Sequence, residues 1–241
     1  MQTKAPGPGV PGEAGSAVEP AVLAAAVAYS KLGLVEQLVT SLRQHPGLLH
    51  CRDGEGRSCL HYAAGYGSEE VVDMLLAKAA DARCGDVNGD LPLHFAAIHG
   101  HAMCAYNLAK ASTGSCLERN QRGQSAIDVA VACARGEVLN AMLLACAGDN
   151  SSVAVGAMQR LLRNGAVPDT WAPNGSSALM LAASVDSTTA LQVLLDAGAT
   201  LELQDALGRT ALMFAAGNSA VGALRTLLGA GACIAQRDRR G

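Results

Sequence analysis

Apolar residues recur along the chain in blocks about 33 residues apart. Three pairs of adjacent leucines share this spacing and stand at 161–162, 194–195 and 227–228. Turn glycines keep nearly the same interval and stand at 56, 89 and 123, then at 175, 208 and 241. Because two independent markers share one period, the pattern predicts an array of stacked structural repeats.

Each block predicts two helices joined by a tight turn. In "SCLHYAAGYGSEEVVDMLL", Leu60, Ala63 and Ala64 share one face of the first helix, and four apolar residues between 71 and 76 form a stripe on the second. Gly67 between the helices allows a backbone turn with positive φ. Polar segments such as "DVNGD" and "DALGR" have the residues of a short hairpin that leads into the next unit.

The composition favours a core of small side chains. Half of the residues are apolar but only 3% are aromatic, so alanine, leucine and valine must fill the space between closely packed helices. One repeat cannot bury its own apolar face, and its stability therefore comes from stacking on its neighbours. We expect Leu195, in the second of the leucine pairs, to be buried in this way.

The period breaks between Gly123 and Gly175, which lie 52 residues apart, one period plus 19. A complete helix pair comes first, and 151–169 then gives a single helix of the second type with no hairpin before it. In one interpretation this is a truncated fifth repeat, with an insertion at 147–152. In the other, the helix at 137–147 belongs to the fifth repeat and the fourth repeat is the incomplete one. The sequence leaves both interpretations open.

The sequence of one unit resembles a known repeat. The matching stretches lie at 58–76, 91–101, 125–144, 177–199 and 210–232. Their pattern is similar to that of the ankyrin-repeat family, whose signature is Thr-Pro-Leu-His-x-Ala at a period of about 33 residues. The resemblance covers the chain from residue 53 to its end, with 20–52 as a degenerate first repeat. It implies an all-α solenoid of antiparallel helix pairs joined by short β-hairpin-like loops.

We expect a disordered tail rich in proline and glycine at 1–19, followed by an ankyrin-repeat domain at 20–241. The approximate repeats are 20–52, 53–85, 86–119, 120–149, an irregular or truncated unit at 150–171, then 172–204, 205–237 and the start of a further repeat at 238–241. The last unit lacks a polar cap. We therefore expect either a fragment of a larger protein or another domain or partner that covers this end.

Charge and composition exclude some partners. The net charge of −3 and the pI of about 6.0 give no general attraction for phosphate backbones, so we expect no nucleic-acid partner. No apolar stretch reaches the length of a membrane span, and we expect none. The eight cysteines form no Cys-x-x-Cys pair. This indicates reduced thiols in an intracellular, cytoplasmic protein, with a nuclear location left open.

Two histidines resemble catalytic groups because imidazole titrates near neutral pH. His61 lies two residues from Cys59, but His94 recurs at the same repeat position. In the ankyrin family this histidine bonds the neighbouring hairpin backbone, so the resemblance implies that His61 and His94 tie adjacent repeats together. The fourth repeat has Asp128 at this position and later repeats have methionine, which weakens the network toward the C-terminus.

The other histidines and the glycine-rich stretches indicate neither a metal site nor a phosphate-binding site. His99 and His101 have no Cys, Asp or Glu nearby in the sequence to complete a metal site. The glycine-rich stretches do not match a phosphate-binding loop. We therefore expect no catalytic residue, no metal, no cofactor and no enzyme activity in this chain.

Ankyrin arrays bind other proteins through hairpin tips and the solvent-facing side of the first helices, which together form a concave groove; this is carried over from the family. The corresponding positions are Glu55, Arg57, Tyr66, Asn88, Asp90, Ile98, His99, Arg122, Gln124, Trp171, Asn174, Val185, Leu207, Arg209 and Asn218. Their mixed charge and scattered apolar side chains suit a folded protein or an extended peptide. Trp171 is either a binding anchor or a cover for the irregular repeat, and the sequence leaves both open.

The resemblance therefore implies a non-catalytic scaffold or adaptor. We expect it to act as a monomeric array that binds a partner protein of unknown identity. The alternative is a regulatory or substrate-recruiting array of a larger enzyme, such as a ubiquitin ligase, kinase or acyltransferase, whose catalytic part lies outside this chain.

Overall fold

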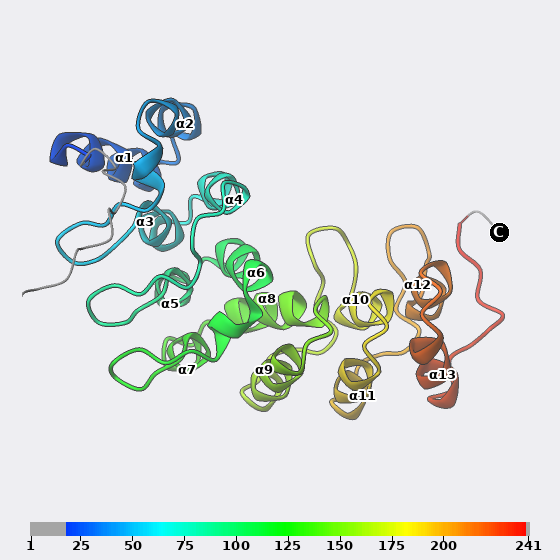
Figure 1. Cartoon of the computed structure of the whole chain (residues 1–241). Coiled ribbons are helices and arrows are strands. Elements are labelled where there is room, and N and C mark those ends of the chain that lie inside the picture. The colour runs from blue at the N-terminus through cyan, green and yellow to red at the C-terminus, as the bar shows by residue number, and fades with distance from the viewer. Residues whose placement is uncertain (1–17, 240–241) are drawn as a thin grey trace, which may run out of the picture.

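The computed structural model describes residues 18–239, which form an array of helix pairs (Figure 1). The first part contains α1 (Pro20–Leu32), α2 (Val35–Gln44), α3 (Cys59–Tyr66), α4 (Glu69–Ala77), α5 (Pro92–His99), α6 (Ala102–Ala111), α7 (Ala126–Ala132) and α8 (Gly136–Ala147). The second part contains α9 (Ser152–Arg163), α10 (Ala178–Ser184), α11 (Thr188–Asp196), α12 (Ala211–Gly217) and α13 (Val221–Gly229). Two short 3-10 helices, η1 (Pro46–Leu49) and η2 (Thr113–Cys116), follow α2 and α6.

The described residues confirm the predicted fold class, an all-α solenoid of antiparallel helix pairs joined by hairpin-like loops. They form no strand, and their isolated β-bridges pair Arg119 with Ser125 and Trp171 with Ser177. Most of the expected disordered tail falls on 1–17, and the end of the expected further repeat falls on 240–241. Both ranges lie outside the described residues.

Side chains that accept backbone hydrogen bonds shape the hairpins between helix pairs. Four Oδ1 atoms each accept bonds from the N–H groups two and four positions later, at 2.8–3.0 Å, and they belong to Asp53, Asp86, Asn120 and Asp205. A glycine three residues further on takes a positive φ, as Gly89 does at 74°, where a side chain is disfavoured. Neighbouring hairpins then stack through the backbone, for example from Val87 N–H to the Glu55 carbonyl at 2.9 Å.

The core consists of small and aliphatic side chains. None of the seven aromatic residues in the chain is among its buried residues. The first leucine of each pair is fully buried, as Leu161, Leu194 and Leu227 show. The expectation for Leu195 is wrong, because Leu195 is only partly buried. One residue further along the helix turns the side chain away from the neighbouring helix and toward solvent.

Helix α8 is shared by two repeats. On one side it pairs with α7 and packs on α6, as the second helix of a regular unit does. On the other side it packs on α9 and on the first helix α10, as a first helix does. Nine of its twelve residues are buried, against three of nine in α4, because it has neighbours on both faces. One interpretation placed this helix in the fourth repeat and the other placed it in the fifth. Each describes the contacts on one side of α8.

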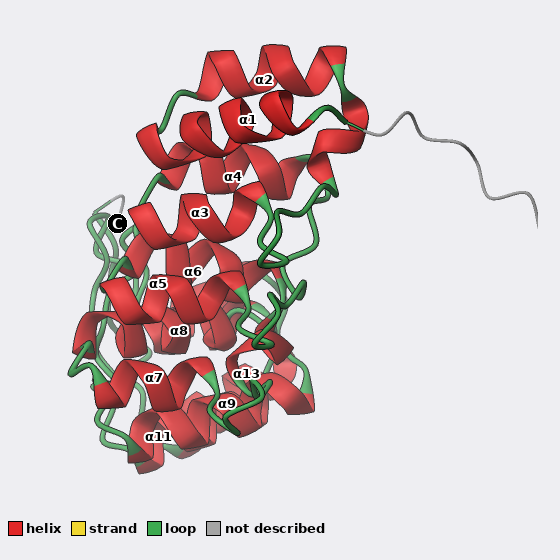
Figure 2. Cartoon of the chain, turned by 90° about the vertical axis from the view of Figure 1, so that its left-hand side faces the viewer, coloured by secondary structure: helices red, strands yellow, loops and turns green. Residues whose placement is uncertain are grey.

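Sharing α8 changes the direction of the array. In Figure 1 the loops before α3, α5 and α7 project to the left, whereas those before α10 and α12 project upward. Figure 2 shows α1, α3, α5 and α7 side by side along one face, in the order of their packing. The hairpin surface is thus divided into two parts that point in different directions.

An ion pair marks the point where the direction changes. Asp128 in α7 occupies the repeat position of His61 and His94, and its carboxylate accepts hydrogen bonds from Ser125 N–H at 2.9 Å and from Arg160 of α9 at 2.5 Å. Burial raises the pKa of Asp128, but the bonds from Ser125 and Arg160 outweigh it and hold the pKa below its ordinary value. The carboxylate at this position therefore forms an ion pair with Arg160 of α9.

Leu194→Asp tests the packing of the second helices. The variant places an unpaired carboxylate in a fully buried site, and we expect it to lower the free energy of unfolding by more than about 3 kcal/mol. Leu195→Asp is the matched control, with an expected loss of about 1 kcal/mol because the side chain is partly exposed. Urea unfolding followed by circular dichroism measures both. Equal losses would contradict the burial assigned to the two leucines.

Arg160→Gln and Asp128→Asn test the ion pair at the junction. Because about a third of the Asp128 side chain is exposed, solvent screens the pair, and we expect a coupling of about 1 kcal/mol in a double-mutant cycle. Arg163→Gln, an exposed residue on the same helix, serves as the control and should leave stability unchanged. Strictly additive losses for the two junction variants would show that the pair does not hold α9 in place.

Candidate protein-binding surfaces

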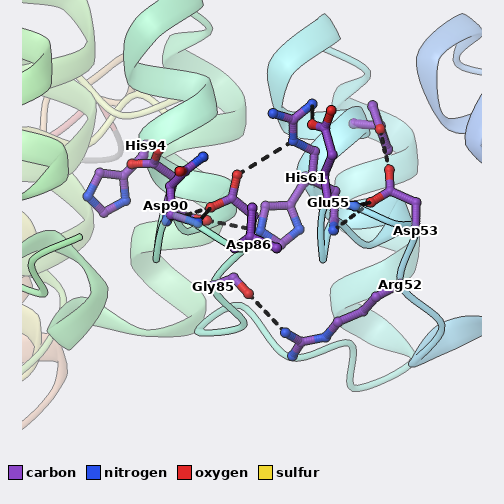
Figure 3. Close-up of polar contacts among 12 residues, drawn as sticks. Arg52, Asp53, Glu55, His61, Gly85, Asp86, Asp90 and His94 are labelled. Carbon is purple, nitrogen blue, oxygen red and sulfur yellow. Dashed lines mark hydrogen bonds and ion pairs between the residues drawn. The ribbon is translucent and has the colours of Figure 1, made fainter. Parts of the chain in front are cut away.

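His61 connects its own repeat to the next one (Figure 3). Its Nδ1 atom accepts a hydrogen bond from Ser58 N–H at 3.0 Å, and its Nε2–H group donates to the Asp90 carbonyl oxygen at 3.1 Å. The ring is fully buried, and this burial lowers its pKa from 6.5 to about 4. The imidazole is therefore neutral at neutral pH, with both nitrogens engaged.

His94 repeats this arrangement one unit later. Its Nδ1 atom accepts from Leu91 N–H and its Nε2–H donates to the Gln124 carbonyl, both at 3.1 Å, and burial again lowers its pKa. In a later unit the Met180 sulfur accepts the N–H of Ser177 at 3.4 Å but has no proton to donate onward. The geometry supports the inter-repeat role expected for both histidines and leaves neither ring free to act as a base.

An open cleft lies on the exposed side of α1, α3 and α5, and we call it the groove cleft. It has an empty volume of about 1000 Å³ and reaches down to the buried His61 and to Gly65. Its other lining residues are the basic Lys31, Arg57, His99 and His101 and the aromatic Tyr62, Tyr66 and Phe95. The lining contains neither Asp nor Glu.

Cations lie over aromatic rings in the groove cleft. Lys31 Nζ is 4.6 Å from the ring centroid of Tyr62 and 5.5 Å from that of Tyr66. The guanidinium carbon of Arg57 is 5.2 Å from the centroid of Phe95. Such contacts restrain long side chains at a modest gain in energy. Tyr66 nevertheless keeps 59% of its surface exposed, so its ring remains accessible to a partner.

The two permanent cations of the groove cleft differ in their partners. Arg57 Nη1 forms an ion pair with Glu55 at 2.6 Å, and Arg57 Nε lies 3.5 Å from the buried carboxylate of Asp86. Figure 3 shows Glu55 and Asp86 on neighbouring hairpins. Lys31 makes no ion pair within residues 18–239. The charge of Arg57 is therefore largely compensated, whereas that of Lys31 is not.

The structure brings together part of the groove expected from the sequence. Tyr66 and His99 line the groove cleft, and Ile98 beside them is exposed. The hairpin positions that are exposed or partly exposed are Glu55, Arg57, Asn88, Arg122 and Gln124. Asp90 differs, because only 7% of its surface is exposed and its carboxylate accepts a hydrogen bond from Asn120 Nδ2 at 2.6 Å. Asp90 thus braces two hairpins, and its side chain is largely buried.

The other expected residues lie on the second part of the array. Trp171 is 45% exposed and lines a hollow of about 600 Å³, and Asn174 and Val185 line another of about 1050 Å³. Both hollows are also lined by Tyr106 of α6 and Leu144 of α8, and we call them together the elbow cleft. Trp171 therefore faces the inner corner of the bend, on a different surface from the groove cleft.

Three expected residues lie further along, in the last helix pair and its hairpin. Leu207 is exposed at the hairpin tip. Arg209 pairs with Asp205 at 2.7 Å, and its guanidinium carbon lies 4.5 Å from the ring centroid of Phe214. Asn218 Nδ2 donates to the Phe214 carbonyl at 2.9 Å. The single groove expected from the sequence is therefore divided between separate surfaces.

Lys31, Phe95 and Tyr106 line the two clefts but were not expected there. The aromatic residues that line a cleft are Tyr62, Tyr66, Phe95, Tyr106 and Trp171. They make up five of the seven aromatic residues in the chain. Aromatic side chains are enriched at protein interfaces. Because no aromatic ring is fully buried, most aromatic positions were themselves a signal of a surface role.

Residues 18–239 give little support for a metal site or a membrane span. They contain no cluster of three or more His, Cys, Asp or Glu side chains that could hold a metal ion. None of their helices combines the length and the apolar character that crossing a bilayer requires. All eight cysteines are free thiols, of which Cys133 and Cys233 are exposed.

Stacked helix pairs, braced hairpins and inter-repeat histidines define a solenoid protein built from helix–hairpin units. The chain belongs to the ankyrin-repeat family, because the family model described as "Ankyrin repeats (3 copies)" matches residues 21–115 and 143–238. The resemblance seen in the sequence is confirmed. The match leaves out 116–142, which contains α7 and the first part of α8, where the array changes direction. Ankyrin repeats are protein–protein interaction domains, and the chain carries such a domain.

Known proteins match parts of the chain. It is 48% identical to "Ankyrin repeat protein nuc-2" of Neurospora crassa over 44 residues, 18% of this chain and 4% of the relative. It is 38% identical to "Transient receptor potential cation channel subfamily A member 1 homolog" of Caenorhabditis elegans over 72 residues, 29% of this chain and 6% of the relative. It is 38% identical to "Probable E3 ubiquitin-protein ligase XBOS32" of Oryza sativa subsp. japonica over 69 residues, 28% of this chain and 14% of the relative. The chain thus spans at most 14% of the length of these relatives.

One similar solved structure is the ankyrin repeat domain of Bcl-3, described as a unique member of the IkappaB protein family. It has a TM-score of 0.45 and 25% sequence identity, and the comparison covers 92% of this chain and 91% of that chain.

The buried histidines predict a loss of stability at mildly acidic pH. The unfolded chain binds a proton at His61 below about pH 6.5, but the folded protein does so only near its pKa of about 4. The free energy of unfolding should therefore fall as the pH drops from 6.5 toward 4, by up to about 3 kcal/mol for His61. His94 acts in the same direction.

The measurement is urea unfolding at about pH 7 and about pH 5, above the range in which most carboxylates titrate. His61→Met copies the residue found at the same repeat position in Met180. We expect this variant to be less stable at neutral pH and to show a smaller loss between the two pH values. A loss equal to that of the parent protein would mean that His61 does not carry the pH dependence.

Proposed function

We propose that this chain is a non-catalytic scaffold or adaptor that binds a partner protein through the groove cleft and the neighbouring hairpin tips. The groove cleft carries the proposal, because it is an open hollow on the first-helix side, lined by three aromatic rings with cations held over them. Aromatic and basic side chains that are already restrained at a surface lose little entropy on binding and often dominate the energy of an interface.

The chemistry of the described residues favours binding over catalysis. His61 and His94, which looked like catalytic groups, have both ring nitrogens engaged and lowered pKa values. The ankyrin-repeat fold is generally non-catalytic, and we infer that this chain works without a cofactor or metal, as a monomeric array. Five of its eight thiols are buried, which suits the reducing interior of a cell. The cytoplasm, with the nucleus as an alternative, is the location that we propose.

A second function is supported by one comparison. The stretch of this chain that matches the probable E3 ubiquitin-protein ligase of rice makes up 14% of that relative. In this alternative, the groove cleft recruits a substrate or regulator for a ubiquitin ligase, kinase or acyltransferase whose catalytic part lies outside this chain. A transcript that continues into a catalytic domain after the codon for Gly241 would favour the alternative, and a stop codon there would favour the adaptor.

Combined replacement of Tyr66 and His99 by alanine tests the proposed function. Both side chains are exposed and line the groove cleft, so we expect the variant to remain folded by circular dichroism and to lose its protein partners. Partners captured from cell extract are quantified by mass spectrometry. Glu70→Ala combined with Lys78→Ala, at exposed positions of the second helix α4 and its C-cap, is the control and should keep them. An unchanged set of partners for the Tyr66 and His99 variant would place the binding site elsewhere.

A further inference from the structure

The groove cleft has a chemical bias that points to one kind of partner. Two permanent cations and two exposed or partly exposed histidines line it, and no carboxylate does. The protein as a whole has a net charge of −3, so this local excess of basic groups opposes the overall charge. Charges across an interface tend to be complementary. The lining of the groove cleft therefore matches a negatively charged segment.

Lys31 is the main basic group of the groove cleft that a negatively charged segment could contact. It comes from the last turn of α1, and its Nζ atom lies over the Tyr62 and Tyr66 rings without an ion-pair partner in the described residues. A ring face attracts a cation but does not neutralise its charge. Its ammonium group is thus held at the cleft with unused capacity to donate charge-assisted hydrogen bonds.

The two histidines extend the basic lining from the end of α5 to the start of α6. His101 Nε2–H donates to the Gly65 carbonyl at 3.1 Å, which fixes this ring against α3. The His99 ring stacks on the His101 ring at a centroid distance of 6.2 Å and is exposed. The exposed His99 ring can supply an N–H donor to an acceptor in the cleft.

The surroundings of the cleft limit what can carry the negative charge. Glu55 and Asp86 lie on the hairpins beside it, next to Arg57. A nucleic acid presents a row of phosphates and needs a continuous basic track, which these carboxylates interrupt. Apolar surface is also close by, because Tyr66 and Ile98 are exposed on neighbouring first helices. An acidic side chain next to an apolar one fits this combination.

We propose that the groove cleft binds an acidic segment of a partner protein, in which an Asp or Glu carboxylate lies against Lys31 and His99 and an adjacent apolar side chain packs on Tyr66. This inference rests on the proposed function, since it names the chemistry of the partner at the same site.

Selection of random peptides displayed on phage against the full chain tests the proposal. Recovered peptides are synthesised, and their affinity is measured by fluorescence polarisation at rising ionic strength. We expect Asp and Glu to be enriched, and replacement of the acidic residue by Asn or Gln to weaken binding about ten-fold, as loss of one charge-assisted contact implies. Lys31→Gln should weaken binding to a similar extent, and added salt should weaken the parent complex.

Lys78→Gln is the matched control, because Lys78 is exposed after α4 and lines none of the clefts described above. Peptides that depend on Tyr66 and His99 but show no acidic enrichment, or that bind Lys31→Gln as well as the parent, would overturn the inference and leave the proposed function standing. Peptides insensitive to combined loss of Tyr66 and His99 would overturn both. Displacement of a bound peptide by an equal concentration of a single-stranded oligonucleotide would point to nucleic acid and also overturn the inference.

Discussion

Helix α8 is the element on which the shape of the whole array depends. An ordinary surface helix has one apolar face, but α8 is buried from Val138 to Ala147 with a single partly exposed residue, Asn140. A helix that is apolar all round is stable only with neighbours on every side. It packs on α6 and α7 before it and on α9 and α10 after it. The missing first helix of the fifth unit therefore leaves no gap, because α8 takes its place, and the direction of the array follows from that double contact.

The residue that links one unit to the next differs with the polar group that the next unit presents. After α3 and α5, where a regular hairpin follows, a neutral histidine donates to its carbonyl, as His61 and His94 do. After α7 the neighbour is the cationic Arg160, and the same repeat position holds the carboxylate of Asp128. A neutral donor would not compensate that charge, whereas a carboxylate accepts from both its own backbone and the arginine. The change of residue type at one repeat position thus has an electrostatic cause.

Features set by local sequence could be predicted, whereas those set by tertiary packing could not. The period, the helix pairs and the hairpins depend on nearby residues, so the fold class was evident. The double role of α8 depends on contacts with helices on both sides, and the sequence shows it only indirectly, through the break in the period and the apolar run at 141–147. A leucine pair does not reveal which member is buried, and Leu195 was assigned wrongly. Asp90 looked like an outward hairpin residue, but its carboxylate bonds Asn120 of the next hairpin.

The bend also limits how long a partner segment the first part can hold. Four first helices, α1, α3, α5 and α7, stand side by side before the array turns. Packed helices lie about 8–10 Å apart, so this row spans about 30 Å, the length of roughly nine extended residues. Beyond α7 the unit formed by α8 and α9 brings no hairpin, and the next one, which carries Trp171, faces the elbow cleft instead. A segment bound there as we propose would therefore be recognised by few residues, and the unpaired charge of Lys31 would have a large share in its selection.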